Sequence, residues 1–593
     1  MTENGVPSEP LDLLLLDTFG YTNLPPLGML YVATYAQSMG YKAKALVLQS
    51  QIVDGTPGSF SRPYLQRLLR EHRPQAVGIP VYAESEAGAA RVCRRIREYS
   101  DAKILVGGPQ ATANPSAVMA RTGADALVMG DGESRTVAIL EAWKTNGVPA
   151  DLRGMLFRRN GEILHDGDGP GPAMPLDALP SPDYSLVLNR DTGVRTLVTG
   201  RGCPFRCTFC FEGRSEKYRM RRLDLVLREL HHLLTASPVK MLAILDDTFT
   251  LNRERVRSIC GLIKKHYGGP WFCEGRIEVL YRNPDIIDLL AEAGLTRIQL
   301  GLESGNQRVL DAYGKHTTPD QIRWVFQRCA EAGIASVIGN FIVGGAFEDN
   351  DTFNDTMHMA RDLIDLCPGS VELLTCFLYP YKGTAIEQRP EEFDLEFLPD
   401  LHFYNAISRI VPFNRTKCLS RGEISQFRMT LDAFIRQHKL SKVDELPAEV
   451  IEKHFLLCRD HRISSEWYQT LVRCPGLAVY ARYLIEFHKR TWSEVKTRPD
   501  WLEHCPVRMG NESPRLEGDD LVLRVRHRKE VRLNGLDRRL FELSAGKLSL
   551  ADMVPILRDQ PAWRHLDAQT LIQALSCSNE LLARDFLLVY GSI

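Results

Sequence analysis

The chain has 593 residues, of which 44% are hydrophobic and 25% are charged, as is typical of a globular protein. Its 73 Lys and Arg residues nearly balance its 74 Asp and Glu residues, so the net charge of -1 gives no electrostatic case for a nucleic-acid partner. No run approaches the ~18 apolar residues of a membrane span, and the polar start is not that of a signal peptide. The 14 cysteines are too sparse for a disulfide framework, so we expect reduced thiols and a cytoplasmic protein of several domains.

The first part of the chain alternates short apolar runs with helical patterns. Strands are expected at residues 11–16, 44–48, 76–80, 103–106 and 126–129. Helices are expected at residues 27–39, 63–71, 84–99 and 134–144. This alternation predicts an α/β fold with a doubly wound, Rossmann-like parallel sheet over residues 1–147. In such sheets the ligand crevice lies beyond the carboxyl ends of the strands.

Glycines follow three of these predicted strands. Gly107-Gly108 and Gly130-Asp131-Gly132-Glu133 come after the fourth and fifth strands, where a missing side chain lets the backbone approach a ligand. With Pro26-Leu27-Gly28 after the first strand, they resemble the cobalamin-binding domain of one class of radical S-adenosylmethionine (SAM) enzymes. The resemblance implies a set of cobalamin contacts: Pro26, Leu27, Gly28, Tyr82, Gly107, Gly108, Gly130, Gly132 and Glu133.

The histidine that occupies the lower face of cobalt in other cobalamin proteins has no counterpart here. The Asp-x-His-x-x-Gly motif is absent, and His72 and His165 are the only histidines before residue 200. We therefore expect cobalamin without a protein histidine on cobalt, its lower face covered by loop residues such as Tyr82 or Glu84. The alternative is a domain that kept this fold and lost the cofactor.

Residues 148–193 are rich in Gly, Pro and Asp and contain a hairpin pattern at 155–164 with an Asn-Gly turn. We expect a linker here between two domains.

Three cysteines with C-x3-C-x2-C spacing follow this linker: Cys203, Cys207 and Cys210. A tetrahedral zinc site needs a fourth ligand, yet the next cysteine is Cys260. Three thiolates suit a [4Fe-4S] cluster whose fourth iron is free to take a small ligand. With Phe209 before the last cysteine, the motif resembles that of radical SAM enzymes, which implies that the free iron binds the amine and carboxylate of SAM.

From residue 194 the alternation of strands and helices resumes and predicts six strands, a partial (β/α)6 barrel over residues 194–388. Polar residues and glycines stand at the carboxyl ends of these strands, where rigid groups can hold a zwitterion and a diol. The family resemblance implies that the following residues contact SAM: Phe209, Asp246, Arg276, Glu303, Ser304 and Gly344. Asp247 falls at the strand end of Asp246. For Asp247 and Glu303, capping of the next helix is the alternative role.

The remainder divides into a helical region, 389–512, and a smaller α+β region, 513–593. Strand patterns at 520–526 and 530–533 precede helices at 535–543, 550–558 and 567–582. This order resembles the small winged-helix domain of pyrroloquinoline quinone biosynthesis, which implies docking of a peptide or partner as an added strand. A structural lid is the alternative.

These features predict a cobalamin-dependent radical SAM methyltransferase that acts on an unactivated carbon or a phosphinate of a natural-product intermediate or peptide. The implied cofactors are a [4Fe-4S] cluster, SAM and cobalamin, and the implied partner is an electron donor such as flavodoxin or ferredoxin, with no nucleic acid or membrane partner. A radical SAM epimerase, cyclase or rearrangement enzyme is the alternative. A non-catalytic, metal-stabilised binding module is the alternative from another class.

Overall fold

The structure is a computed structural model of the chain. It describes residues 9–18, 27–47, 62–167, 169–188, 193–211, 218–398, 411–487, 489–509, 514–525 and 529–591. Pro26, one of the predicted cobalamin contacts, lies outside these residues. The chain forms two compact units: the first comprises residues 1–325, 339–359 and 374–431, and the second comprises residues 326–338, 360–373 and 432–593. The domain boundaries expected from the sequence stay predictions.

The first unit begins with a seven-stranded sheet in the order β2-β1-β3-β4-β5-β6-β7. Its strands are β1 (Leu13–Asp17), β2 (Ala43–Val47), β3 (Ala76–Pro80), β4 (Lys103–Gly107), β5 (Ala126–Val128), β6 (Met155–Arg159) and β7 (Glu162–His165). The pairs among β1 to β5 are parallel, which confirms the doubly wound Rossmann-like sheet. The hairpin β6–β7, expected within the linker, extends this sheet in antiparallel fashion from β5.

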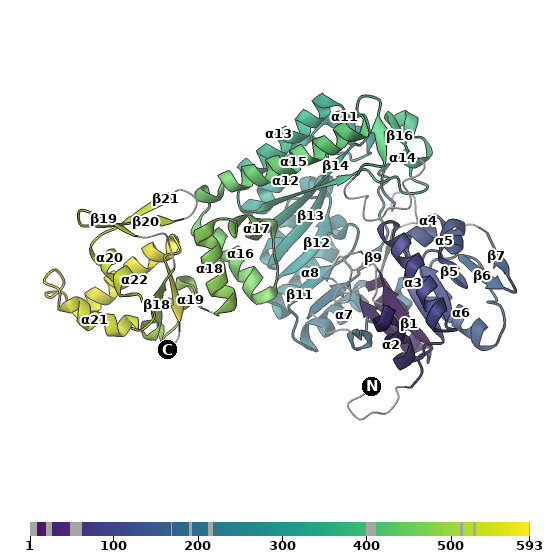
Figure 1. Cartoon of the computed structure of the whole chain (residues 1–593), viewed down its shortest axis with the longest axis horizontal. Coiled ribbons are helices and arrows are strands. Elements are labelled where there is room, and N and C mark those ends of the chain that lie inside the picture. The colour runs from purple at the N-terminus through teal and green to yellow at the C-terminus, as the bar shows by residue number, and fades with distance from the viewer. Residues whose placement is uncertain are drawn as a thin grey trace. The chain divides into compact units, whose positions relative to one another are not determined.

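Helices cover both faces of this sheet (Figure 1). They are α1 (Leu27–Ser38), α2 (Arg62–His72), α3 (Glu86–Tyr99), α4 (Pro109–Ala113), α5 (Pro115–Thr122) and α6 (Glu133–Lys144). Leu13 and Leu15 of β1 pack in a core with α1 and α6, whereas Leu14 and Leu16 pack in a core with α2, α3 and α5. This alternation explains why the strand sequence is apolar throughout, because both faces of a parallel strand are buried.

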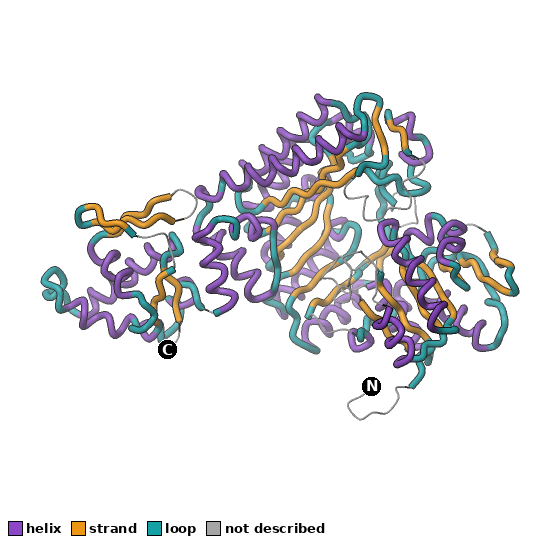
Figure 2. The backbone as a smooth tube through the Cα atoms, viewed as in Figure 1, coloured by secondary structure: helices purple, strands orange, loops and turns teal. Residues whose placement is uncertain are grey.

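The second sheet has six strands in the order β15-β14-β13-β12-β11-β8, which confirms the predicted partial barrel. The strands are β8 (Val194–Leu197), β11 (Met241–Ile244), β12 (Trp271–Gly275), β13 (Leu295–Glu303), β14 (Ser336–Val343) and β15 (Val371–Phe377). The intervening helices are α7 (Leu223–Thr235), α8 (Arg253–His266), α9 (Ile277–Arg282), α10 (Asp285–Glu292), α11 (Gln307–Ala312), α12 (Pro319–Glu331) and α13 (Asn350–Leu366). Figure 2 shows these strands fanning across the molecule with helices along them.

Short elements and a helical region follow the barrel. They are α14 (Ala385–Gln388), β16 (Leu395–Phe397), β17 (Asn414–Thr416), α15 (Arg421–Ser441), α16 (Ala448–His461), α17 (Glu466–Leu471), α18 (Pro475–Glu486) and α19 (Trp492–Val495). Four of the helices build a core around Phe455, Trp467 and Tyr480.

The last part of the chain has a core of its own, which includes Phe541, Leu571 and Tyr590. Its strands are β18 (Cys505–Arg508), β19 (Arg515–Glu517), β20 (Asp520–Val525), β21 (Lys529–Leu533) and β22 (Leu588–Gly591). Its helices are α20 (Gly535–Leu543), α21 (Leu550–Arg558) and α22 (Ala568–Arg584). Strands β19, β20 and β21 form one antiparallel sheet, and β18 pairs with β22. Identity with a winged-helix peptide-binding domain stays a prediction.

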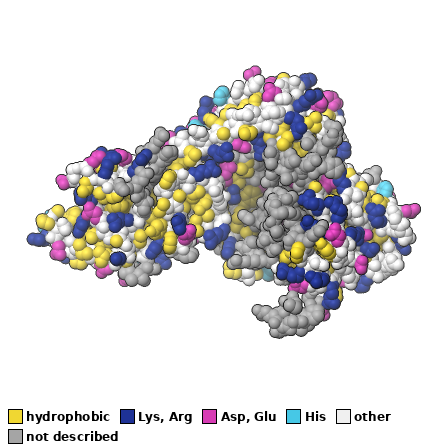
Figure 3. Space-filling model, in the orientation of Figure 1, with side chains coloured by type: hydrophobic (Ala, Val, Ile, Leu, Met, Phe, Trp, Pro, Cys, Tyr) yellow, Lys and Arg dark blue, Asp and Glu magenta, His cyan; other side chains and the backbone are white. Residues whose placement is uncertain are grey.

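The distribution of charged side chains on the surface agrees with the near-zero net charge. On the face drawn in Figure 3, Lys and Arg side chains and Asp and Glu side chains both occur over most of the described surface. Within the described part of the chain, no helix has the length and apolar character needed to cross a membrane.

Candidate active site

The three motif cysteines lie on the loop between two short strands, β9 (Gly200–Arg201) and β10 (Arg219–Met220), which pair antiparallel. Cys207 is buried, Cys203 and Cys210 are half-buried, and none is in a disulfide. The backbone amide of Cys210 donates to the Cys207 carbonyl at 3.1 Å, and Thr208 donates to the Tyr313 carbonyl at 3.2 Å. A tight turn anchored on the end of α11 therefore holds the second half of the motif.

Among the described residues, no three His, Cys, Asp or Glu side chains converge as they would on a single metal ion. A [4Fe-4S] cluster does not require this, because each thiolate binds a different iron. Three cysteines outside any disulfide on one loop, two of them half-buried, are the donor set that such a cluster takes.

Arg276 lies directly against the cysteine motif, and its contact with SAM stays a prediction. Its Nη1 atom donates to the Cys207 sulfur at 3.2 Å, and its guanidinium stacks 3.7 Å from the centre of the Phe205 ring. A buried ion pair with Glu278, 2.7 Å long, orients it. A cation next to a cysteine favours the thiolate, the form that binds iron.

The two carboxylates after β11 have different surroundings. The buried Asp246 side chain accepts hydrogen bonds from the amide and the hydroxyl of Thr199, and it thereby holds the end of β8. Burial raises the pKa of Asp246 to about 6 in spite of these bonds. Asp247 is exposed and accepts from the backbone amide of Gly202, one residue before Cys203. The contact of Asp246 with SAM stays a prediction, and the structure offers Asp247 as the more accessible group.

Glu303, Ser304 and Gly344 lie at the ends of β13 and β14, and internal hydrogen bonds hold each of them. Glu303 has a positive φ of 63° and forms a buried ion pair of 3.0 Å with Lys315. The Ser304 hydroxyl accepts from the Asn306 amide at 3.1 Å. The Gly344 amide donates to the buried Glu348 carboxylate. The positive φ of a residue other than glycine indicates backbone strain of the kind that accumulates at functional sites.

Phe209 contacts Tyr313 edge to face, with 4.9 Å between the ring centres, and it packs against a core that includes Val309 and Ile342. Its contact with SAM stays a prediction.

Glu274 is a residue of the barrel that the sequence prediction did not select. It pairs with Gln299 in the register of β12 and β13 and is half-buried. Burial and the neighbouring charge of Asp247 raise its pKa to about 7. The signal in the sequence was a single acidic residue directly after the apolar run Trp271-Phe272-Cys273.

A cavity of about 370 Å³ lies beyond the carboxyl ends of the N-terminal strands. Eight of the nine predicted cobalamin contacts line it: Leu27, Gly28, Tyr82, Gly107, Gly108, Gly130, Gly132 and Glu133. Val198, Arg201 and Leu245, from the ends of barrel strands, line the same cavity. Gly28 lines the cavity, and a Cβ atom added there would meet no atom within 4 Å, so a larger side chain has open space beside the cavity. The lining is mainly apolar with glycine loops at its edge, which fits a large, flat cofactor.

His72 is the last residue of α2, and its backbone carbonyl accepts a hydrogen bond from the amide of Leu11, just before β1. His72 therefore lies near the amino end of β1, whereas the cavity lies beyond the carboxyl ends of the strands. Tyr82 lines the cavity, and burial raises the pKa of its hydroxyl to about 12. The described residues that line the cavity include no histidine. The absence of a histidine ligand to cobalt stays a prediction.

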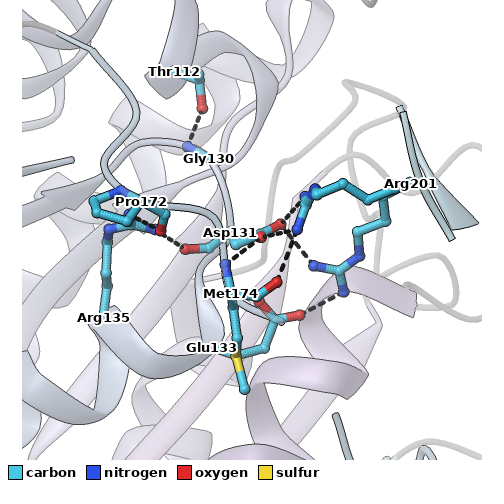
Figure 4. A network of polar contacts seen from close by, with 9 residues as sticks. Thr112, Gly130, Asp131, Glu133, Arg135, Pro172, Met174 and Arg201 are labelled. Atoms are coloured by element: carbon cyan, nitrogen blue, oxygen red, sulfur yellow. Dashed lines mark hydrogen bonds and ion pairs between the residues drawn. The ribbon is translucent and has the colours of Figure 1, made fainter. Parts of the chain in front are cut away.

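An ion-pair network joins the cavity loop after β5 to the strands that flank the cysteines (Figure 4). Asp131 and Glu133 bind Arg201 at 2.8 Å and 2.6 Å, and Arg219 binds Asp131 at 3.0 Å. Arg135 donates to the carbonyls of Asp131 and Pro172 at 2.7 Å and 2.8 Å, which fixes the same loop from below.

Comparisons with known proteins agree with this architecture. A family model described as the B12 binding domain matches residues 14–140, and one described as the radical SAM superfamily matches residues 197–360. An uncharacterised methyltransferase of Pyrococcus horikoshii is 26% identical over 381 residues, which are 62% of this chain and 78% of the relative. An anaerobic magnesium-protoporphyrin IX monomethyl ester cyclase of Rubrivivax gelatinosus is 26% identical over 357 residues, which are 57% of this chain and 62% of the relative.

Among solved structures, the radical SAM methyltransferase TsrM from Kitasatospora setae, with cobalamin and a [4Fe-4S] cluster bound, superposes with a TM-score of 0.57. The match has 17% sequence identity and covers 71% of this chain and 91% of that one, so it shows a shared fold. The two matched domains imply three cofactors, a [4Fe-4S] cluster, SAM and cobalamin. The chain therefore combines a B12 binding domain with a following radical SAM domain, the two domains of cobalamin-dependent radical SAM enzymes.

Proposed function

We propose that this protein is a methyltransferase that uses cobalamin and SAM to methylate an unactivated carbon or a phosphinate of a small molecule or peptide. One observation carries the proposal: residues from the ends of barrel strands, Val198, Arg201 and Leu245, close the same cavity that the glycine loops of the B12 binding domain line. A methyl carrier held there would face the barrel. Relatives named as methyltransferases support the same activity.

Cys203, Cys207 and Cys210 are the proposed cluster ligands. When bound, the cluster and SAM supply a 5′-deoxyadenosyl radical, and cobalamin supplies the methyl group. The contribution of this chain is to position these groups. Arg276 holds a positive charge at the Cys207 sulfur, and the Phe205 ring below it excludes water from this contact.

Asp247, Glu274 and Glu303 are the proposed acceptors for SAM or substrate at the strand ends. Asp247 is fixed to the cluster loop through Gly202, so its carboxylate could accept from the ammonium group of SAM. Glu303 is held by Lys315, which keeps its carboxylate in one orientation. Rigid acceptors of this kind bind an amine or a hydroxyl with little loss of conformational entropy.

The aromatic residues Phe211, Tyr379, Tyr381 and Phe413 form one continuous cluster near the last barrel strand. Tyr379 lies 4.7 Å from Tyr381 and 4.9 Å from Phe413, and Phe211 lies 6.4 Å from Tyr381, measured between ring centres. Burial raises the pKa of both tyrosine hydroxyls well above the usual value, so these groups stay neutral. We propose that this cluster shields the reacting carbon from water.

Anaerobically purified and reconstituted protein tests the proposal. We expect iron, sulfide and cobalt in the preparation and an absorbance spectrum with both cluster and cobalamin bands. With substrate, we expect 5′-deoxyadenosine, S-adenosylhomocysteine and methylated product together. Cys203→Ala, Cys207→Ala and Cys210→Ala should each abolish reductive cleavage of SAM, whereas Cys577→Ala, at an exposed cysteine of α22, should not. Reductive cleavage that survives in the three motif variants would refute the assignment of the cluster.

A radical cyclase or rearrangement enzyme is the second candidate, because several relatives are named as cyclases. Products distinguish the two activities: formation of 5′-deoxyadenosine without S-adenosylhomocysteine would favour the second. A one-electron donor such as flavodoxin or ferredoxin is the proposed partner in both cases.

Binding of a peptide substrate by the C-terminal region is a separate proposal. Strand β21 lies at an edge of the β19-β20-β21 sheet, where an extended peptide can add a strand through main-chain hydrogen bonds. Glu530→Pro on β21 should abolish peptide binding in a fluorescence polarisation assay if the substrate is a peptide, and should change nothing for a small-molecule substrate.

A further inference from the structure

The loop that carries the cysteines is closed by an arginine on each side. In the β9–β10 pair, Arg201 stands opposite Arg219, and the three cysteines lie on the chain between them. Both arginines reach the same residue, Asp131, which lies 70 positions before Arg201 in the sequence. The base of the cysteine loop is therefore fastened to the B12 binding domain.

Arg201 makes the closest of these contacts. Its two Nη atoms bind the Asp131 carboxylate at 2.8 Å and the Glu133 carboxylate at 2.6 Å, and its guanidinium lies 5.3 Å from the centre of the Tyr31 ring. Both carboxylates are buried, with side chains 8% and 3% exposed. Charge-assisted bonds that are shielded from water hold their geometry more firmly than surface pairs do.

Arg219 completes the connection from the other strand. It binds both Asp131 oxygens, at 3.0 Å and 3.3 Å, and donates to the Met174 carbonyl at 2.9 Å. The Met174 amide donates to Asp131 at 3.1 Å. We call Asp131, Glu133, Arg201 and Arg219 the loop clamp.

Glu133 of the loop clamp has a buried oxygen whose hydrogen bonding the described residues leave unsatisfied. Glu133 lines the cavity, and its Oε1 atom binds Arg201, whereas its Oε2 atom is buried and has no hydrogen-bond partner among the described residues. A buried carboxylate oxygen without a donor is costly, and buried polar atoms almost always have partners. A ligand in the cavity that carries an amide or a hydroxyl would supply the missing donor.

We propose that the loop clamp is a positioning device that couples the occupied cobalamin cavity to the cluster loop: Glu133 accepts a hydrogen bond from cobalamin through Oε2 and holds Arg201 through Oε1. This inference rests on the proposed use of cobalamin. Because coupling is reciprocal, cobalamin should stabilise the cluster on the loop, and the cluster should strengthen the retention of cobalamin.

The native full-length protein tests the coupling without any variant. Iron release from the reconstituted cluster to a chelator is followed by absorbance, with and without aquacobalamin. We expect aquacobalamin to slow iron release about fivefold or more, the lower end of usual coupling strengths. Equal rates with and without bound aquacobalamin would overturn the inference and leave the proposed function intact.

The Glu133→Gln variant tests the contact itself. Glutamine has one acceptor oxygen where glutamate has two, so it cannot bind Arg201 and accept from cobalamin through separate oxygens. We therefore expect the Kd for aquacobalamin to rise about tenfold and the effect on iron release to disappear. Asp125→Asn is the matched control, because Asp125 is a part-buried carboxylate of the same domain that binds Arg97 at 2.5 Å, before β5 and away from the cavity. It should bind aquacobalamin as the native protein does.

The outcomes of these experiments distinguish failure of the loop clamp from failure of the proposed function. Weaker binding and lost coupling in Glu133→Gln, with native behaviour in Asp125→Asn, support the clamp. Native affinity and native coupling in Glu133→Gln refute it. A native protein that binds no aquacobalamin, by absorbance and cobalt content, overturns the proposed function and the inference with it.

Discussion

Glu274 titrates near neutral pH because it is half-buried beside Asp247, and this has a consequence for stability. Its pKa of about 7 lies above the ordinary value of 4.5, so the folded protein binds this proton more tightly than the unfolded chain does. The contribution of Glu274 to the free energy of unfolding is therefore greatest below pH 4.5 and falls as the pH rises through 7.

We expect Glu274→Gln to remove this pH dependence. At pH 8 the variant should be more stable than the native protein by about 1 kcal/mol or more, and at pH 4 the two should be alike. Thermal unfolding at both pH values measures the difference. A variant whose stability relative to the native protein does not change with pH would show that Glu274 is well solvated.

Arg276 is the residue on which the electrostatics of the cluster loop depend. We expect Arg276→Lys to load less iron on reconstitution, because lysine cannot hold Cys207, Glu278 and the Lys315 carbonyl at once. Arg276→Ala should also lower stability by about 3 kcal/mol or more, since Glu278 is left buried without its partner. Iron and sulfide analysis and thermal unfolding check both effects. Arg282→Lys, at an exposed arginine of α9, should match the native protein.

At the scale of elements, helix α1 offers a test of the cavity that does not disturb the fold. Gly28 and Gly261 both lie in helices, and an added Cβ meets no atom within 4 Å at either. Leucine is favoured over glycine in a helix by roughly 0.5–1 kcal/mol, so Gly28→Leu and Gly261→Leu should both fold and unfold at or above the native temperature.

Only Gly28→Leu should lose cobalamin, because its side chain occupies the cavity. Cobalt content after gel filtration measures the loss, and Gly261→Leu on α8 serves as the control. Retention of cobalamin in Gly28→Leu at the native level would place the cofactor elsewhere.

The elements themselves were largely predictable. The expected strands and helices of the N-terminal sheet agree with the structure to within a few residues, because apolar runs with turn residues between them are a local signal. Helices α4 and α5 were not expected. The hairpin β6–β7 shows that a local signal predicts a hairpin but not the sheet that it joins. Its Asn-Gly turn was evident from the sequence, but its pairing with β5 depends on contacts between distant strands.

At the scale of the whole molecule, binding of cobalamin should slow hydrogen exchange only in the segments around the cavity and the cysteine loop. We expect hydrogen exchange to slow in the loops after β4 and β5 and in the β9–β10 pair, and to stay unchanged in residues 529–591, none of which lines the cavity. Hydrogen–deuterium exchange with and without aquacobalamin measures this. Equal protection throughout the chain would indicate general stabilisation instead of an occupied cavity.

The sequence by itself determined the class of the protein, since cysteine spacing, glycine loops and the order of strands are properties of short segments. Only the tertiary structure decided which side chains serve the site. It placed Asp246 on Thr199 and left Asp247 exposed, and it joined Asp131 to Arg201 across 70 positions. These contacts and exposures depend on which distant segments meet and on how deeply each side chain is buried. Local periodicity in the sequence determines neither of these.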